Sequence, residues 1–170
     1  MKVGRITISD RASAGIYEDL SGPEIERLLR SYFTDIGGFE VAVIPDDLPL
    51  IATTLIEFAE ARGCDLIVTT GGTGITPRDV TPEATRSVLE RELPGFGEAT
   101  RMQSFAKVRT SILSRATAGT RGRSLIINLP GKPKAVAECI EILAPAIREA
   151  VAHLQGRDPH ATQTRELANQ

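Results

Sequence analysis

The sequence is poor in the residues that usually build metal sites and disulfide frameworks. Its 170 residues include only two cysteines and two histidines. Cys64 and Cys139 stand far apart without a CxxC pair, and His153 and His160 both fall near the C-terminus. This arrangement argues against a zinc site and against a disulfide. We therefore expect both cysteines to be small buried residues, one on a strand and one on a helix.

Long apolar runs and a leader-peptide pattern are also missing. No segment approaches about eighteen consecutive apolar residues, and the N-terminus runs directly into a strand-like pattern at residues 3–8. We therefore expect no membrane span and a cytoplasmic location. Hydrophobic residues make up 41% of the chain, which is enough for one sizeable core at this length. The expected organisation is one domain over residues 1–156 and a polar C-terminal tail over residues 157–170.

Acidic residues are absent between Glu98 and Glu138, although the net charge of the whole chain is only −2. Clustered cations repel one another unless they are solvated or face negative charge, so this segment predicts either a solvated basic face or contact with phosphate or nucleic acid. Phe105 is the only aromatic residue there, so the platform on which single-stranded nucleic acid would stack is missing. We therefore expect no nucleic-acid partner. The eight cations of the segment are Arg101, Lys107, Arg109, Arg115, Arg121, Arg123, Lys132 and Lys134.

Short apolar runs alternate with longer helical patterns along the chain. Runs rich in β-branched residues predict buried strands at residues 3–8, 39–44, 66–70 and 125–129. Helices are expected between and after them, at residues 21–36, 48–62, 81–92, 98–107 and 133–154. Strands and helices in alternation predict a single-domain α/β fold with an open, mostly parallel sheet in a three-layer α/β/α arrangement.

Several features locate the helix boundaries. A capping box at Ser21 is expected to open the first helix, and Thr81 is expected to be the N-cap of the third. The Pro94-Gly95 pair should break the chain before the helix at residues 98–107. In the last helix, Pro145 should produce a kink or a division, because proline removes a backbone donor.

Candidate functional residues follow the predicted strands. Ligands bind beyond the carboxyl ends of the strands in open parallel sheets, so residues from different strands converge there. The candidates after the four strands are Ser9 and Asp10, then Asp46, then Thr70, Gly71, Gly72, Thr73 and Gly74, then Asn128, Pro130, Gly131 and Lys132.

The glycine loop after the third strand predicts an anion cradle. Glycines at 71, 72 and 74 allow backbone N–H groups to face a ligand that a bulky side chain would block. The loop matches neither the Walker A nor the Rossmann spacing, and by itself a tight strand-to-helix turn explains it as well.

Two aspartates stand near this cradle. Asp79 precedes a helix and could cap it, or it could coordinate magnesium beside bound phosphates. Asp46 could supply a second carboxylate, although a turn with an N-cap at Asp46-Asp47 is an equally good interpretation. The turn from Asn128 to Lys132 repeats the strand–turn–helix pattern, and its backbone could read a heterocycle while Lys132 meets a phosphate.

Residues 69–85 closely resemble the molybdenum-cofactor family of Mog, MoaB and gephyrin-type G domains. The resemblance also includes residues 8–15, 94–97, 113–115 and 128–133, and it extends in order over roughly residues 2–155. It implies the molybdopterin-binding type of α/β fold. Within the family, the sequence around Asp46 and in the first loop is most similar to the adenylyltransferase branch.

The resemblance implies that Mg²⁺ and ATP are used to adenylylate molybdopterin, with release of pyrophosphate. Asp46 and Asp79 match the family's essential carboxylates, which would be catalytic and would hold Mg²⁺. Ser104, Ser114 and Asn128 match family positions that bind substrate, whereas Arg115 and Lys132 are candidates on charge alone. The family also implies a homotrimer and transfer of the product to a molybdenum insertase. The alternative is a MoaB-like protein that binds molybdopterin without turnover.

Overall fold

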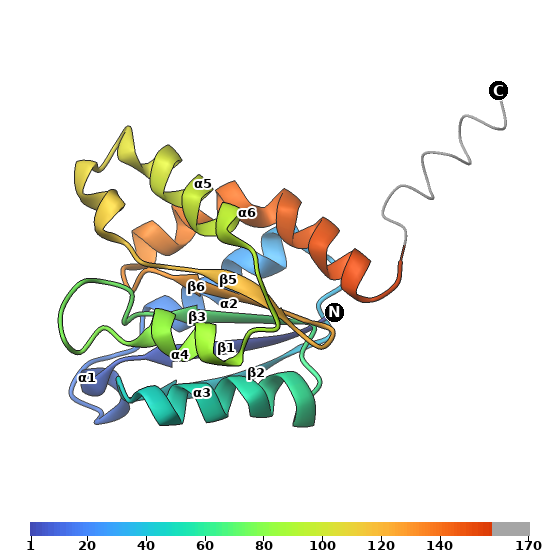
Figure 1. The fold of residues 1–170 in the computed structure, drawn as a ribbon, viewed down its shortest axis with the longest axis horizontal. Coiled ribbons are helices and arrows are strands. Elements are labelled where there is room, and N and C mark those ends of the chain that lie inside the picture. The colour runs from blue at the N-terminus through green and yellow to red at the C-terminus, as the bar shows by residue number, and fades with distance from the viewer. Residues whose placement is uncertain (158–170) are drawn as a thin grey trace, which may run out of the picture.

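A six-stranded sheet forms the centre of the molecule in the computed structural model, which describes residues 1–157 (Figure 1). Across the sheet the strand order is β2-β1-β3-β6-β5-β4. The strands β2, β1, β3 and β6 are parallel, β5 pairs antiparallel with β6, and β4 pairs antiparallel with β5. The bounds are β1 Lys2–Ile8, β2 Gly38–Ile44, β3 Leu66–Thr70, β4 Arg91–Glu92, β5 Ala118–Arg121 and β6 Ser124–Leu129.

Helices cover both faces of this sheet and give three layers (Figure 1). On one face lie α2, α5 and α6, and on the other lie α3 and α4. The bounds are α1 Asp10–Ser13, α2 Ser21–Tyr32, α3 Leu48–Ile56 with its π-helical continuation η1 Glu57–Ala61, α4 Thr81–Val88, α5 Pro94–Phe105, the 3₁₀ turn η2 Arg109–Leu113, and α6 Pro133–Leu154. The predicted three-layer, mostly parallel α/β fold is confirmed.

Burial of β1, β3 and β6 on both faces explains why these strands read as apolar runs. The prediction of burial is wrong for β2, which lies at the edge of the sheet with Val41 and Val43 exposed. In β3, Leu66 and Val68 belong to the core under α2 and α6, whereas Ile67 belongs to the core under α3 and α4. Cys139 on α6 is buried as expected, and Cys64 is also buried but lies just before β3. No helix within residues 1–157 is long and apolar enough to cross a membrane.

Two predicted caps are wrong. Ser21 and Thr81 are the first residues of α2 and α4, and neither residue at the N-cap position, Leu20 or Val80, makes a side-chain cap. The Asp19 carboxylate, three residues earlier in the chain, accepts a bond from the Gly22 amide at 2.9 Å instead. The Thr81 hydroxyl donates to the Gly71 carbonyl at 3.0 Å and so fastens the glycine loop to α4.

Helix bounds differ from the prediction at several places, and α2 ends at Tyr32 and not at residue 36. Residues 91–92 form the short strand β4, so α4 ends at Val88. Pro94 and Gly95 lie in the first turn of α5, where the missing proline N–H costs no hydrogen bond. Helix α6 is not divided at Pro145, because core residues before and after it, such as Leu143 and Ile147, hold both parts against the sheet. Beyond Arg157, the predicted polar tail lies outside the described residues.

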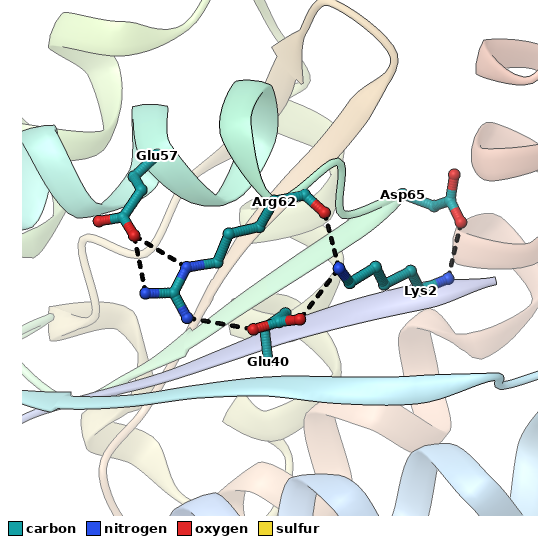
Figure 2. Close-up of polar contacts among 5 residues, drawn as sticks. All are labelled: Lys2, Glu40, Glu57, Arg62 and Asp65. Atoms are coloured by element: carbon teal, nitrogen blue, oxygen red, sulfur yellow. Dashed lines mark hydrogen bonds and ion pairs between the residues drawn. The ribbon is translucent and has the colours of Figure 1, made fainter.

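A connected network of charges lies near the edge where β1, β2 and β3 begin (Figure 2). The Lys2 ammonium contacts Glu40 at 2.9 Å and donates to the Arg62 carbonyl at 2.8 Å. The Arg62 guanidinium binds Glu40 at 3.1 Å and Glu57 at 2.7 Å, and the Lys2 amide donates to Asp65 at 2.7 Å. We call Lys2, Glu40, Glu57, Arg62 and Asp65 the amino-edge network. Within it, both cations face carboxylates.

The opposite edge contains the point where the chain changes direction across the sheet. From β1 the chain passes to β2 on one side and then crosses back to β3 on the other side of β1. Loops that leave the carboxyl ends of β1 and β3 therefore diverge, and an opening forms between them. The predicted site residues follow these strand ends.

Candidate functional site

The glycine loop after β3 adopts backbone conformations that require glycine. Gly71 has φ of 99° and Gly72 has φ of 62°, in the left-handed region. A β-carbon on Gly71 would lie 2.2 Å from the Ile8 carbonyl oxygen, and one on Gly72 would lie 2.3 Å from the Thr81 hydroxyl oxygen. A β-carbon on Gly131 would lie only 3.5 Å from the Gly71 Cα, so the loops after β1, β3 and β6 meet at this point.

Beside this loop lies a cavity of about 280 Å³, which we call the carboxylate cavity. It opens between the ends of β1 and β3, as expected for the switch point of an open sheet. Of the predicted residues, Ser9, Asp46, Thr70, Gly71, Gly72, Asp79 and Gly131 line it. Residues missed by the sequence analysis also line it, among them Tyr17, Glu18, Asp19, Ser21 and Arg78. The only signal for the latter group was proximity to the first strand end and, for Arg78, to Asp79.

Asp46 and Asp10 hold each other through reciprocal hydrogen bonds. The Asp10 amide donates to the Asp46 carboxylate at 3.0 Å, and the Asp46 amide donates to the Asp10 carboxylate at 3.0 Å. Arg78 donates to both oxygens of Asp10, at 3.0 and 2.7 Å. Asp10 itself is not among the described residues that line the cavity, and it supports Asp46 from behind. Asp47, and not Asp46, caps α3, because the Asp47 carboxylate accepts a bond from the Leu50 amide at 2.9 Å.

Asp79 fastens its own loop. Its carboxylate accepts hydrogen bonds from the Thr76 amide at 2.8 Å and from the Thr76 hydroxyl at 2.6 Å. A β-carbon on Gly74 would lie 2.9 Å from the same carboxylate, and one on Gly72 would lie 2.9 Å from the Asp46 carboxylate. Both predicted aspartates therefore lie directly against the glycine loop. Asp79 does not cap α4, which excludes the simpler interpretation of this residue.

The carboxylates have opposite pKa shifts. Burial raises the pKa of Asp46, and the negative charges of Asp10 and Asp79 raise it further. Burial also acts to raise the pKa of Asp79, but hydrogen bonds from Thr76 and Gly74 and the charge of Arg115 outweigh it and lower the pKa. Hydrogen bonds from Arg78 lower the pKa of Asp10. The raised pKa of Asp46 therefore reflects its burial first and the neighbouring carboxylates second.

A second cavity of about 490 Å³, which we call the lysine cavity, lies on the other side of the glycine loop. It shares Asp79 and Gly131 with the carboxylate cavity. The predicted residues that line it are Thr73, Gly74, Ser104, Ser114, Asn128, Pro130 and Lys132. The structure therefore brings these residues together, although they come from different segments of the chain. Lys132 is exposed, and its ammonium group has no partner within residues 1–157.

Two predicted ligand residues are already occupied by protein contacts. The Asn128 side chain is buried and donates to Thr69 at 3.0 Å and to Thr85 at 2.9 Å, so it joins β6 to β3 and α4. Arg115 is not among the described residues that line either cavity. Its guanidinium donates to Gly74, Asp79 and Glu83.

The donor set fits a magnesium ion that is shared with a ligand. Within residues 1–157 there is no group of three or more His, Cys, Asp or Glu side chains that could hold a metal by themselves. Asp46 and Asp79 supply hard oxygen ligands beside a loop suited to phosphate, and Mg²⁺ is commonly held by one or two carboxylates together with substrate phosphates.

Comparisons with known proteins give a consistent result. The family model described as "Probable molybdopterin binding domain" matches residues 4–149. The chain is 50% identical over 154 residues to the molybdopterin adenylyltransferase of Helicobacter pylori strain J99, covering 91% of this chain and 88% of that protein. It is 44% identical over 153 residues to the molybdopterin adenylyltransferase of Escherichia coli K12, covering 90% and 78%.

A solved structure has the same architecture. The molybdopterin biosynthesis enzyme MoaB of Thermus thermophilus superposes with a TM-score of 0.83 at 40% identity, and the match covers 92% of this chain and 97% of that one. With this coverage, the similarity is one of the whole domain and not of an isolated motif.

Proposed function

The chain belongs to the molybdopterin-binding domain family, and on that premise we propose that it transfers an adenylyl group from ATP to molybdopterin in molybdenum cofactor biosynthesis. An oxygen of the molybdopterin phosphate attacks the α-phosphorus of ATP. The bond from this phosphorus to the bridging oxygen of the β-phosphate breaks, and that oxygen leaves with pyrophosphate. The products are adenylyl-molybdopterin and pyrophosphate, so the enzyme is a nucleotidyltransferase.

The observation that carries this proposal is that two cavities of different charge meet at Asp79 and Gly131. Four carboxylates line the carboxylate cavity, and Arg78 is the one Lys or Arg among its described lining residues. A metal-bound nucleotide suits such a surface better than a bare anion does. The lysine cavity offers the free ammonium of Lys132 and the hydroxyls of Ser104 and Ser114 to the phosphate of the pterin.

The chain's own groups act by positioning and electrostatics. The Gly71 amide donates to the Leu129 carbonyl and the Gly74 amide to the Asp79 carboxylate, so the amides of Gly72 and Thr73 are left to face the ATP phosphates. Asp46 and Asp79 would hold the Mg²⁺ that accompanies the nucleotide. When bound, Mg²⁺ would neutralise the charge that develops on the departing pyrophosphate. The shared wall at Asp79 and Gly131 brings the attacking oxygen and the α-phosphorus together, and such orientation can supply a large part of the rate.

The proposal also covers the oligomeric state of the protein, its location and the acceptor of its product. The protein acts as a homotrimer in the cytoplasm and passes adenylyl-molybdopterin to a molybdenum insertase. Support for this part comes from the resemblance of residues 69–85 to the family. Sedimentation equilibrium tests the trimer directly, and a monomer at micromolar concentration would contradict it.

The roles of the aspartates are tested by Asp46→Ala and Asp79→Ala. Each variant is expected to bind molybdopterin normally and to lose adenylylation, because the lysine cavity keeps its lysine and hydroxyl groups. Asp35→Ala is the matched control, since Asp35 lies at the opposite edge beside the N-terminal amine. Pyrophosphate release at the wild-type rate by either site variant would refute the assigned roles.

Binding of molybdopterin without turnover is the alternative that the similarity to MoaB raises. Binding loops can persist in a family after catalysis is lost. Relatives at 44% and 50% identity carry adenylyltransferase names, which favours turnover. Both ligands binding to the wild-type protein without product formation would support the alternative.

A further inference from the structure

Arg115 lies behind the wall that separates the two cavities. It follows Ser114, which lines the lysine cavity, and its amide donates to the Thr73 carbonyl at 2.9 Å. The Arg115 side chain contacts the loop that joins the glycines to α4. Its guanidinium Nε donates to the Gly74 carbonyl at 2.6 Å, Nη2 donates to the Asp79 carbonyl, and Nη1 binds the Glu83 carboxylate.

These contacts connect the two ends of the segment that carries Asp79. Residues 74–79 contain neither helix nor strand. Within the segment, Thr76 bonds to the Asp79 carboxylate and the Asp79 amide donates to the Thr76 carbonyl at 3.0 Å. Arg115 adds the connection from Gly74 to Asp79 and, through Glu83, from the segment to the first turn of α4. A planar fork of donors is suited to hold three acceptors in fixed relative positions.

All three nitrogens of this guanidinium are used by protein acceptors, which distinguishes Arg115 from Lys132. Lys132 lines the lysine cavity, is exposed, and presents an ammonium group without a partner within the described residues. Arg115 is about one-third exposed and lines neither cavity in the described chain. Arg115 and Lys132 were both candidates for binding the ligand phosphate because of their charge, but their environments differ.

We infer that Arg115 is a positioning residue for adenylyl transfer, which holds the Asp79 carboxylate in place while Lys132 meets the pterin phosphate. This inference rests on the proposed function. Arg115 acts through Asp79 and does not touch a substrate. Its loss lets the segment 74–79 relax and moves Asp79 away from the phosphates, and a displacement of about 1 Å in a reacting group can lower a rate about 100-fold.

The test separates the rate of transfer from the affinity for molybdopterin. Arg115→Ala is expected to lower kcat by about 10- to 100-fold and to leave KM for molybdopterin within about twofold. Lys132→Ala is expected to do the reverse, with KM raised about tenfold and kcat little changed. Arg123→Ala is the matched control from the same basic segment, because Arg123 contacts Gln155 far from both cavities.

Further variants exclude a simple loss of folding. Arg115→Lys should remain impaired, since an ammonium group cannot reproduce the planar fork, and free guanidinium ion should restore part of the kcat of Arg115→Ala. If Arg115→Ala does not fold, Glu83→Gln tests the same set of contacts with Arg115 present. A smaller fall in kcat at unchanged KM is expected.

The outcomes separate the inference from the proposed function. A wild-type protein that makes no adenylyl-molybdopterin contradicts the proposed function. A wild-type protein that turns over while Arg115→Ala raises KM at unchanged kcat overturns the inference alone. Unchanged kinetics in both Arg115→Ala and Glu83→Gln would overturn it as well.

Discussion

At the edge where the parallel strands begin, both cations of the amino-edge network bind its carboxylates directly, whereas at the edge where they end four carboxylates and one arginine line a cavity. In the amino-edge network, the Lys2 ammonium and the Arg62 guanidinium share Glu40, and Arg62 also binds Glu57 (Figure 2). At the other edge, the charge of Arg78 acts on Asp10 and Asp46 and that of Arg115 acts on Asp79, and Asp46 forms no ion pair within the described residues. The carboxylates at the amino edge are neutralised by cations of the protein, whereas those at the carboxyl edge would be stabilised most by a bound cation.

The backbone of the two edges differs in the same sense. Gly71 and Gly122 both have positive φ, but Gly71 is enclosed by neighbouring backbone and Gly122 has nothing within 4 Å of a built β-carbon. Close approach at the carboxyl edge leaves backbone N–H groups accessible to a ligand. The turn at Gly122, at the amino edge, needs glycine only for its positive φ. The loop after β3 is therefore constrained by packing as well as by φ.

The largest effect is expected for Gly71→Ala. Its β-carbon would meet the Ile8 carbonyl oxygen at 2.2 Å, which a backbone can relieve only by moving the loop. We expect adenylyl transfer to fall at least about 100-fold and the thermal midpoint to drop. Gly122→Ala is the matched control at the amino edge, with a loss of about 1 kcal/mol from strain and normal kcat. Equal activity in the two variants would contradict the difference between the edges.

Removal of magnesium should affect the two cavities differently. Four carboxylates line the carboxylate cavity, so a chelator should weaken ATP binding by about tenfold or more because the triphosphate then meets them directly. Molybdopterin binding in the lysine cavity should change little. Calorimetric titration of each ligand with and without EDTA measures both affinities. ATP affinity that is indifferent to EDTA would show that the carboxylates do not act through a cation.

A smaller effect is expected for Glu40→Gln in the amino-edge network. The ion pairs are partly exposed, so the thermal midpoint should fall by only about 1–3 °C, less at high salt, with kcat unchanged. Hydrogen bonds from Lys2 and Arg62 lower the pKa of Glu40. Its contribution is therefore present above its unfolded pKa and is lost as pH falls through the lowered folded value. Thermal scans from neutral to acidic pH should show the variant and wild type converging.

The smallest effect is expected for thiol modification. Burial raises the pKa of Cys64 to about 11 and that of Cys139 to about 11. Both thiols should react with a disulfide reagent on the order of 100-fold more slowly than free cysteine. Cys64 stands near the amino edge, whereas Cys139 lines the lysine cavity. Rapid labelling of Cys139 alone, suppressed by molybdopterin, would show that the lysine cavity opens more than the structure indicates.

The sequence allowed the parallel core to be predicted but not the strands at its side. All four strands marked by apolar, β-branched runs were found, but only β1, β3 and β6 are buried; β2 lies at the edge of the sheet, where one face of a strand can meet solvent. The strands β4 and β5 have two and four residues and depend on pairing with each other and with β6, so no local periodicity marks them. Ser21 and Thr81 have the right residue types for caps, but the Asp19 carboxylate, three residues before Gly22, takes the cap position at α2, and the Thr81 hydroxyl binds the Gly71 carbonyl instead of a helix amide.

The sequence predicted the site residues whose positions are determined by the ends of the strands. Asp46 and Asp79 each follow a strand and a loop on the same edge, so their convergence could be expected. The reciprocal bonds of Asp46 with Asp10, and the division of turn and cap functions between Asp46 and Asp47, depend on atomic positions. The positive charge of Arg115 suggested that it binds a ligand phosphate. In the structure it binds the backbone carbonyls of Gly74 and Asp79, and because every residue has a carbonyl, the sequence could not reveal these acceptors.

The most direct test of the central claim follows the label of ATP. Purified protein is incubated with molybdopterin, Mg²⁺ and ATP that is labelled at either the α- or the γ-phosphorus, and pterin and pyrophosphate are separated. Adenylyl transfer at the carboxyl edge predicts α-label in the pterin product and γ-label in pyrophosphate, in equal amounts. Transfer of γ-label to the pterin, or no transfer while both ligands bind, would contradict it.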